Sequence, residues 1–239
     1  MLFMRRLIAP LLLGIVVLGA TARVDANDIE TTLRTWVTQN LHFEHDRLPL
    51  IRTQPVRAFI RSDDPEIVGE TRREIANFAE AFGLPIAFVA TEINLAVVIG
   101  ERIADGRKPS RTFLAGLGIP DATIDDIIRV SDWSDGCGLY SGRDDGGRIL
   151  GSIVAADASL SRKQQRSCVA SGVIFGFGMR TAARETIAFP HDHLPFLLIG
   201  RALAGCERQM GDRSNTEAAR IRDAYLDCMV ANLKQKFAE

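Results

Sequence analysis

Four cysteines constrain the fold of this chain more than any other feature of its sequence. Cys137, Cys168, Cys206 and Cys228 all lie in its second half, far behind an N-terminal segment that reads as an export signal. An even number of cysteines in an exported chain indicates two disulfides, and four cysteines allow three connectivities. Zinc is the competing interpretation, but the chain has no Cys-x-x-Cys pair and its cysteine spacings are wide. We therefore expect two disulfides.

The N-terminal segment has the three-part order of a secretory signal peptide. Two arginines precede an apolar run over residues 7–20, and a small-x-small cleavage pattern follows at 20–22. A membrane anchor is the alternative, but a spanning helix needs about 20 apolar residues and this run is shorter. We expect a signal peptide over residues 1–22, with an alternative end at residue 26. The mature protein is then expected to be periplasmic or secreted, with no stable membrane span after cleavage.

The charge of the mature chain excludes one class of partner. Loss of Arg5 and Arg6 with the signal leaves 27 basic residues against 30 acidic ones, a net charge of −3. Nucleic-acid binding depends on clustered Lys and Arg, so we expect no nucleic-acid partner. Residues 27–239 are long enough to bury a full core, and we interpret them as a single domain.

The first part of the mature chain predicts the order helix, strand, helix. Residues 27–40 begin with a capping-box spacing, and residues 55–62 alternate apolar and basic side chains as a half-buried strand does. Asp64-Pro65 predicts the cap and first turn of a helix that ends at Gly83. Two short apolar strands then follow in residues 85–100.

The second part predicts an insertion, a hairpin and several helices. Residues 101–135 contain two short helical segments, which we interpret as a helical insertion. Asp145-Gly146-Gly147 predicts the turn of a hairpin, and Ser161 with Gln164 predicts a capping box at the start of a central helix. Two further helices are expected around 194–206 and 214–237. The predicted fold is α+β: a mixed sheet of about four or five strands, packed helices and a helical C-terminal part.

This order of elements resembles the metzincin-like metalloprotease core. In those enzymes the central helix carries His-Glu-x-x-His-x-x-Gly, which places two imidazoles on one face to bind zinc and a carboxylate beside them to activate water. This chain has no such motif. In its place the central helix carries CVASGVIFGFG, from Cys168 to Gly178.

That run resembles the central helix of an uncharacterised secreted bacterial group, the domain-of-unknown-function family numbered twenty-nine twenty-seven. The family pattern reads Cys-x-x-Glu-Glu-x-x-Gln-x-x-Gly. Cys168 and Gly178 match it, whereas Ser171, Gly172 and Phe175 stand where the pattern has its two glutamates and its glutamine. These three residues cannot act as imidazole ligands or general base, so the resemblance implies a degenerate metalloprotease-like core.

The central helix instead acquires a stripe of small residues. Gly172 and Gly176 follow Cys168 at successive i, i+4 positions, and each interior glycine costs about 1 kcal/mol relative to alanine. The glycines are explained if another part of the protein, or a ligand, approaches this face of the helix closely. We interpret the stripe as internal packing, with a ligand groove as the alternative.

The histidines offer the remaining route to a metal site. His42 and His45 are spaced i, i+3, and His191 and His193 flank Asp192. Neither pair has a third ligand nearby in the sequence, and His191 follows Pro190 at an expected helix start. We interpret all four as solvated or capping residues and expect no metal and no cofactor.

These observations predict an exported, non-catalytic protein with a binding or structural role. A metal-dependent hydrolase that uses His191 and His193, or His42 and His45, is the alternative. For a binding role, we consider an extended peptide or an envelope protein as the partner. In metzincin-like cores the edge strand beside the central helix binds such a peptide, and the resemblance places this strand at residues 148–157.

Of the three disulfide connectivities, Cys137–Cys168 with Cys206–Cys228 is favoured. Cys137 lies in the hairpin just before the central helix that carries Cys168. Cys206 and Cys228 lie on consecutive helices that are expected to fold back on each other.

Overall fold

The structure is a computed structural model, and it describes residues 26–40, 51–179, 194–210 and 218–238. The chain divides into two units, residues 1–32 and 33–239. In the first unit the described residues are the helical start of α2 (Ala26–Asn40). The second unit contains the sheet and the other helices. The expected signal peptide lies outside the described residues.

The centre of the second unit is a five-stranded mixed sheet. Its strand order is β2-β1-β3-β7-β6, and every neighbouring pair is parallel except β6 with β7. The strands are β1 (Val56–Arg61), β2 (Ile86–Phe88), β3 (Leu95–Glu101), β6 (Cys137–Arg143) and β7 (Ile149–Asp157). A mixed sheet with packed helices confirms the predicted α+β class.

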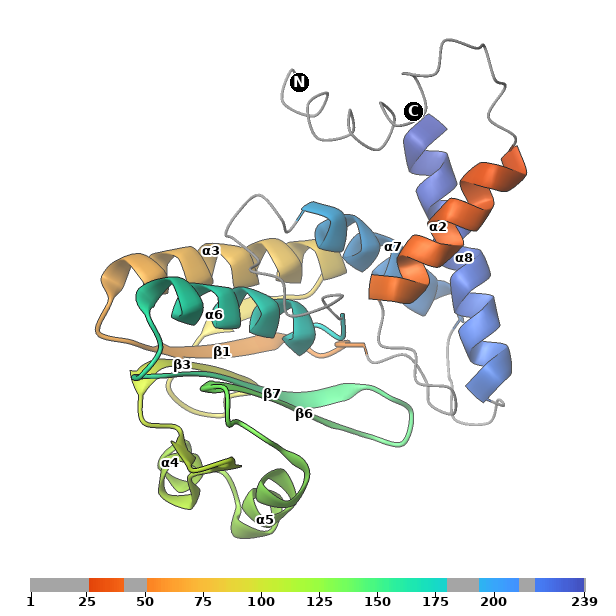
Figure 1. Cartoon of the computed structure of the whole chain (residues 1–239). Coiled ribbons are helices and arrows are strands. Elements are labelled where there is room, and N and C mark those ends of the chain that lie inside the picture. Colours follow the sequence, from red (N-terminus) through yellow and green to blue (C-terminus); the bar gives the residue numbers. More distant parts are fainter. Residues whose placement is uncertain (1–25, 41–50, 180–193, 211–217, 239) are drawn as a thin grey trace. The chain divides into compact units, whose positions relative to one another are not determined.

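Two helices cover one face of this sheet, as Figure 1 shows. They are α3 (Pro65–Phe82) and α6 (Arg162–Gly176). Their ends lie where local chemistry predicts them. The Asp64 carboxylate accepts hydrogen bonds from two backbone amides of the first turn of α3, and Gly83 ends that helix with φ of 66°. Ser161 and Gln164 form the expected capping box of α6.

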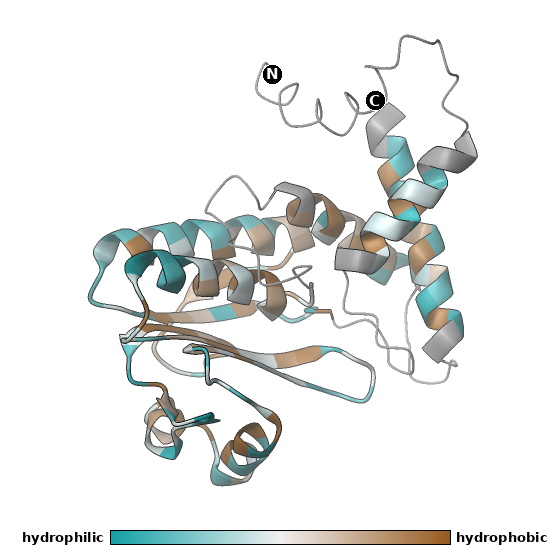
Figure 2. Cartoon of the chain, viewed as in Figure 1, coloured by the Kyte–Doolittle hydropathy of each residue, from teal (hydrophilic) through white to brown (hydrophobic). Residues whose placement is uncertain are grey.

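The apolar sides of these helices and strands meet in the larger core. Figure 2 shows that the strands are largely apolar, whereas α3 and α6 carry hydrophilic residues on their outer surfaces. Val56, Ala58 and Val97 point into this core, where Phe177 contacts both Phe78 and Phe82 with ring centroids 5.4 and 5.3 Å away.

The insertion covers the opposite face of the sheet (Figure 1). It contains the expected short helices, α4 (Arg111–Gly116) and α5 (Asp121–Val130). The structure adds a two-stranded antiparallel ribbon that was not predicted, β4 (Ala104–Asp105) with β5 (Lys108–Pro109). A second core forms here around Val98, Ile153 and Trp133.

The C-terminal part consists of α7 (Leu194–Met210) and α8 (Ala218–Ala238). Cys206 on α7 and Cys228 on α8 form one disulfide, and Cys137 on β6 and Cys168 on α6 form the other. The predicted pairing is therefore confirmed. Among the helices that the structure describes, none combines the length and the apolar character needed to cross a membrane.

One prediction about the sheet is wrong. Residues 148–157 were expected to form an edge strand, but β7 lies between β3 and β6, and β6 is the edge strand on that side. The physical reason is visible in the strand itself: Ser152 to Ala156 are all buried, as expected of a strand covered on both faces and paired on both sides.

Candidate functional site

The four positions compared above with the zinc-protease motif lie along α6 and just beyond its end. Ser171 and Phe175 are half-buried, and Gly172 is fully buried against the sheet. Gly178 follows the helix with φ of 92°, a left-handed conformation that favours glycine. The backbone at position 178 therefore favours glycine, and this is also the position of the glycine in the family pattern that the sequence resembles.

The glycine stripe packs against β7, β6 and the start of β3. A Cβ atom added at Gly172 would lie 2.2 Å from Val154 Cγ1 and 2.9 Å from Leu139 Cδ2, far inside van der Waals contact. A Cβ atom at Gly176 would lie 3.2 Å from Leu95 Cδ1. The interpretation of the stripe as internal packing is confirmed, because sheet side chains already occupy the space beside it.

The Cys137–Cys168 disulfide holds this contact together. It joins the first residue of the edge strand to the helix that lies across it, 31 residues later in the sequence. Cys168 is buried, and Cys137 is partly buried. Ser171, Gly172 and Phe175 are thus on a helix that is covalently fixed to the sheet, and Gly178 follows the end of that helix.

The four histidines all lie outside the described residues. Within the ranges that the structure does describe, no group of three or more His, Cys, Asp or Glu side chains is arranged to hold a metal ion. The candidate ligands His42, His45, His191 and His193 therefore stay predictions of the sequence.

A buried arginine that the sequence did not single out ties α6 to the sheet. Arg52 is 1% exposed; its Nε donates to the Gly176 carbonyl oxygen at 2.8 Å and its Nη2 donates to Ser152 Oγ at 2.9 Å. Burial lowers the pKa of Arg52 to about 10, so it stays charged at neutral pH.

This charge has only neutral partners among the described residues. Nη1 has no hydrogen-bond partner, and the guanidinium lies 5.8 Å from the centroid of the Phe177 ring. A cation beside the last carbonyls of a helix interacts favourably with the helix dipole. Because the group is almost fully covered, we assign it a structural role at the end of α6.

A hollow of about 450 Å³ opens at the other end of the sheet, at the carboxyl ends of β1 and β3. After β1 the chain continues into α3 on one face, and after β3 it continues into the insertion on the opposite face (Figure 1). Adjacent parallel strands whose connections leave to opposite faces create a crevice, and this is where open α/β sheets bind ligands.

A β-bulge in β3 determines what faces the hollow. Ile99 pairs with Ala156 and Glu101 with Asp157, so Gly100 is one extra residue on β3. Its φ of 84° suits a glycine bulge. Ile99 points into the larger core, and the extra residue turns Glu101 to the opposite face, the side of Arg61.

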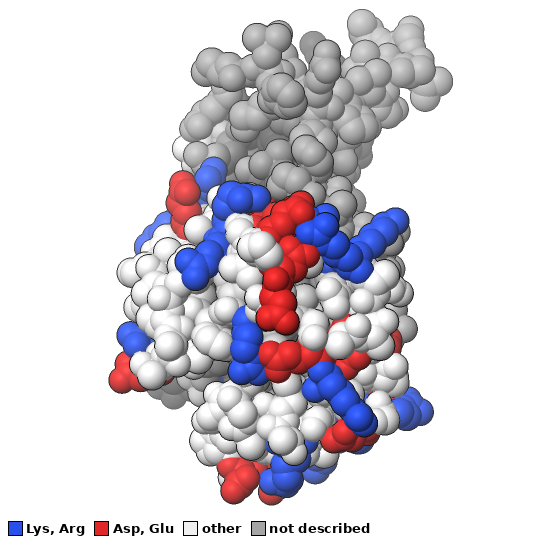
Figure 3. All heavy atoms as spheres, turned by 90° about the vertical axis from the view of Figure 1, so that its left-hand side faces the viewer, with Lys and Arg blue, Asp and Glu red and all other residues white. Residues whose placement is uncertain are grey.

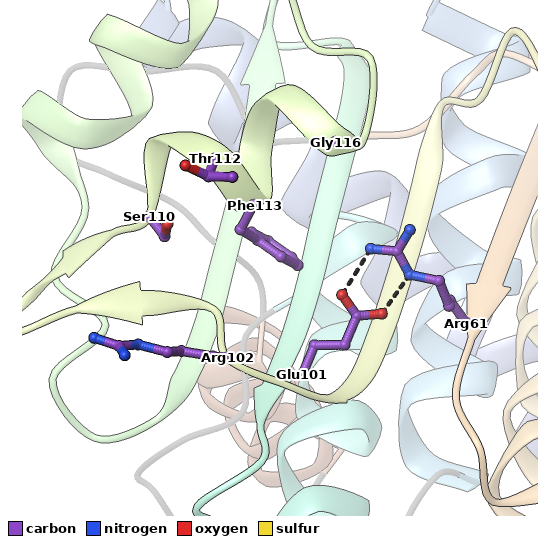
Figure 4. Close-up of a pocket in the computed structure, with 7 residues that line it drawn as sticks. All are labelled: Arg61, Glu101, Arg102, Ser110, Thr112, Phe113 and Gly116. Carbon is purple, nitrogen blue, oxygen red and sulfur yellow. Dashed lines mark hydrogen bonds and ion pairs between the residues drawn. The ribbon is translucent and has the colours of Figure 1, made fainter.

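The two strand-end residues form an ion pair within the hollow, drawn in Figure 4. Arg61 Nη2 donates to Glu101 Oε2 at 2.8 Å, and a second contact joins Nε to Oε1. The two side chains are 39% and 38% exposed, so solvent reaches both. Arg102 and the α4 residues Thr112 and Phe113 complete the rim and floor, with Ser110 just before α4.

A charged network lies on the same side of the molecule, where α3 and α6 begin (Figure 3). Arg162 contacts both Asp64 and Glu66, and Arg166 contacts Glu66 and Glu70. Hydrogen bonding from Arg162 lowers the pKa of Asp64, and hydrogen bonding chiefly from Arg166 lowers that of Glu66. The network joins the two helices, and its three carboxylates and two guanidiniums leave one net negative charge, so it offers no positive charge for an anionic ligand.

Comparisons of the chain with models of protein families, with curated proteins and with solved structures each found no match. The function therefore has to be inferred from the side chains and their geometry.

Proposed function

We propose that this chain is an exported binding protein built on a metzincin-like core whose central helix has lost zinc chemistry. The arrangement of elements supports the resemblance. The sheet order β2-β1-β3-β7-β6 has a single antiparallel strand at its edge, and helix α6 follows directly after β7. The two disulfides support an oxidising compartment, in agreement with the predicted signal peptide.

The packing of Gly172 is the observation that carries the loss of catalysis. In the zinc-protease motif this position holds the carboxylate that activates water. Here Val154 and Leu139 leave no room even for a Cβ atom. Ser171 and Phe175 stand at the two imidazole positions, and a phenyl ring offers zinc no lone pair.

The edge strand supports a binding role. Within the described part of the chain, β6 pairs with β7 on one side and with no strand on its outer side. Proline and charged side chains usually block pairing at an edge; β6 contains no proline, and its one charged side chain is Arg143 at its last position. An extended peptide that adds its backbone hydrogen bonds to β6 is the partner that this edge suits.

Metal analysis and a peptidase assay on the purified, chelator-treated and zinc-reloaded protein test the proposal. We expect substoichiometric zinc and no hydrolysis of unstructured protein substrates. The paired variants His191→Ala/His193→Ala and His42→Ala/His45→Ala serve as controls. One zinc per chain that either pair of substitutions abolishes would contradict the proposal and favour the metal-dependent hydrolase.

A further inference from the structure

The hollow at the ends of β1 and β3 contains polar groups that the fold itself does not use. Among the described residues, neither the Ser110 nor the Thr112 hydroxyl has a hydrogen-bond partner, although Ser110 stands at the position that would cap α4. Both hydroxyls can donate and accept a hydrogen bond. They line the same hollow as the Arg61–Glu101 pair, from which the Phe113 ring separates them, as Figure 4 shows.

The Arg61–Glu101 pair presents a donor edge and an acceptor edge side by side. The guanidinium has N–H groups beyond the two that contact Glu101, and each carboxylate oxygen has a second lone-pair site. Two adjacent hydroxyl groups of one ligand can therefore donate to Glu101 and accept from Arg61 without separating the pair.

The charge of the hollow disfavours an anion. Glu101 neutralises Arg61, and Asp105 lies 3.3 Å from Arg102. An anionic ligand would have to approach the Glu101 carboxylate, and a cationic one the Arg61 guanidinium. Phe113, which is 7% exposed, contributes a small apolar part of the floor, and the volume of about 450 Å³ lies within the range of small-molecule sites.

From this lining we propose that the hollow binds a neutral polyhydroxylated ligand, a sugar unit of monosaccharide to disaccharide size. Vicinal hydroxyls engage Arg61 and Glu101, further hydroxyls engage Ser110 and Thr112, and the apolar face of the ring covers Phe113. This site goes beyond the proposed function, because the hollow lies on the face of the sheet opposite α6. Zinc content and peptide capture do not bear on it.

Titration calorimetry or ligand-observed NMR with defined sugars tests the site. The probes are glucose, maltose and N-acetylglucosamine as free neutral sugars, chitotetraose as a segment of a glycan chain, and glucuronate as an anionic counterpart. We expect saturable binding of at least one neutral probe and weaker binding of glucuronate. Tighter binding of chitotetraose than of the free sugars would identify a glycan as the source of the ligand, and the reverse order a free sugar.

Two substitutions of one exposed residue separate binding from folding. Thr112→Val removes a hydroxyl with little change in shape, and Thr112→Ser retains it. We expect Thr112→Val to weaken binding about 2- to 10-fold, the effect of one hydrogen bond, and Thr112→Ser to bind as the native protein does.

A charge change at the ion pair adds an independent readout. Glu101→Gln leaves Arg61 without its counter-charge, so the preference is expected to shift towards glucuronate. The proposal is overturned if no probe binds saturably, if the native protein prefers glucuronate, or if Thr112→Val and Thr112→Ser bind the neutral probe equally.

Discussion

Gly172→Ala is expected to destabilise the protein, although alanine is the better helix former. In a helix interior, alanine is favoured over glycine by about 1 kcal/mol. At this position the added methyl group would lie 2.2 Å from Val154 Cγ1, more than 1 Å inside normal carbon contact. Overpacking of this kind costs about 1–3 kcal/mol.

The upper part of that range applies to Gly172. Val154 is fully buried and its β-branched side chain has a stiff χ1 angle, so it cannot turn away from the new methyl group. An overpacking cost of about 2–3 kcal/mol less the propensity gain leaves a net loss of about 1–2 kcal/mol in the free energy of unfolding. Gly176→Ala is the comparison, because the closest neighbour of its methyl group is the flexible end of Leu95 at 3.2 Å, and Ser152 Cβ lies at an ordinary contact distance of 3.7 Å. That variant is expected to be close to the native protein in stability.

Urea unfolding of the disulfide-bonded protein measures these differences, and Val154→Ala completes a double-mutant cycle. With both Val154 γ-methyl groups removed, Gly172→Ala is expected to become neutral or stabilising, a coupling of about 2–3 kcal/mol. If Gly172→Ala alone, with Val154 retained, gave a protein at least as stable as the native one, α6 would not pack closely on β7. The interpretation of the stripe as internal packing would then be wrong.

Three further predictions concern the two disulfides, the charged network between α3 and α6, and the β-bulge at Gly100. Replacing either disulfide by a serine pair is expected to cost about 3–4 kcal/mol, since the closed loops span 31 and 22 residues. Free thiols titrated in the denatured, non-reduced native protein would contradict the pairing. Because Arg162 and Arg166 lower the folded-state pKa values of Asp64 and Glu66, their contribution to stability is present above the unfolded value of about 4 and is lost as the pH falls below it. The difference in Tm between the native protein and Arg162→Gln should therefore shrink between pH 7 and pH 3, and a constant difference would argue against this network. Gly100→Ala places a Cβ atom at φ of 84° and is expected to cost about 1–2 kcal/mol, measured by urea unfolding. Gly116→Ala, with open space around it, is the control, and equal stability of the two variants would refute a strained bulge.

Much of the local structure could be predicted because its causes are local. Asp64-Pro65, Gly83 and the Ser161–Gln164 box specify the ends of α3 and α6 by hydrogen bonds within a few residues. The disulfide pairing followed from the hairpin and the two consecutive C-terminal helices that carry the cysteines.

The position of β7 was mispredicted because pairing on both sides of a strand depends on distant partners. The continuous buried run from Ser152 to Ala156 was the available signal for an interior strand. By contrast, β6 is only half covered along most of its length, as an edge strand often is.

The hollow and the buried arginine depend on long-range contacts that no local pattern encodes. Arg61 and Glu101 are 40 residues apart and meet only because β1 and β3 are neighbours and Gly100 adds a bulge. Arg52 and Gly176 are 124 residues apart. A glycine at the end of an apolar strand was the only hint of the bulge, and nothing in the sequence marked Arg52.

Native mass spectrometry of the protein recovered from an exporting host tests the central claim most directly. One spectrum reports the first residue, the number of disulfides and any retained metal. The account predicts a chain that starts at Arg23 or Asn27, lacks four hydrogens because of its two disulfides, and carries no zinc. A zinc adduct of one ion per chain, or an intact Met1 on exported protein, would contradict it.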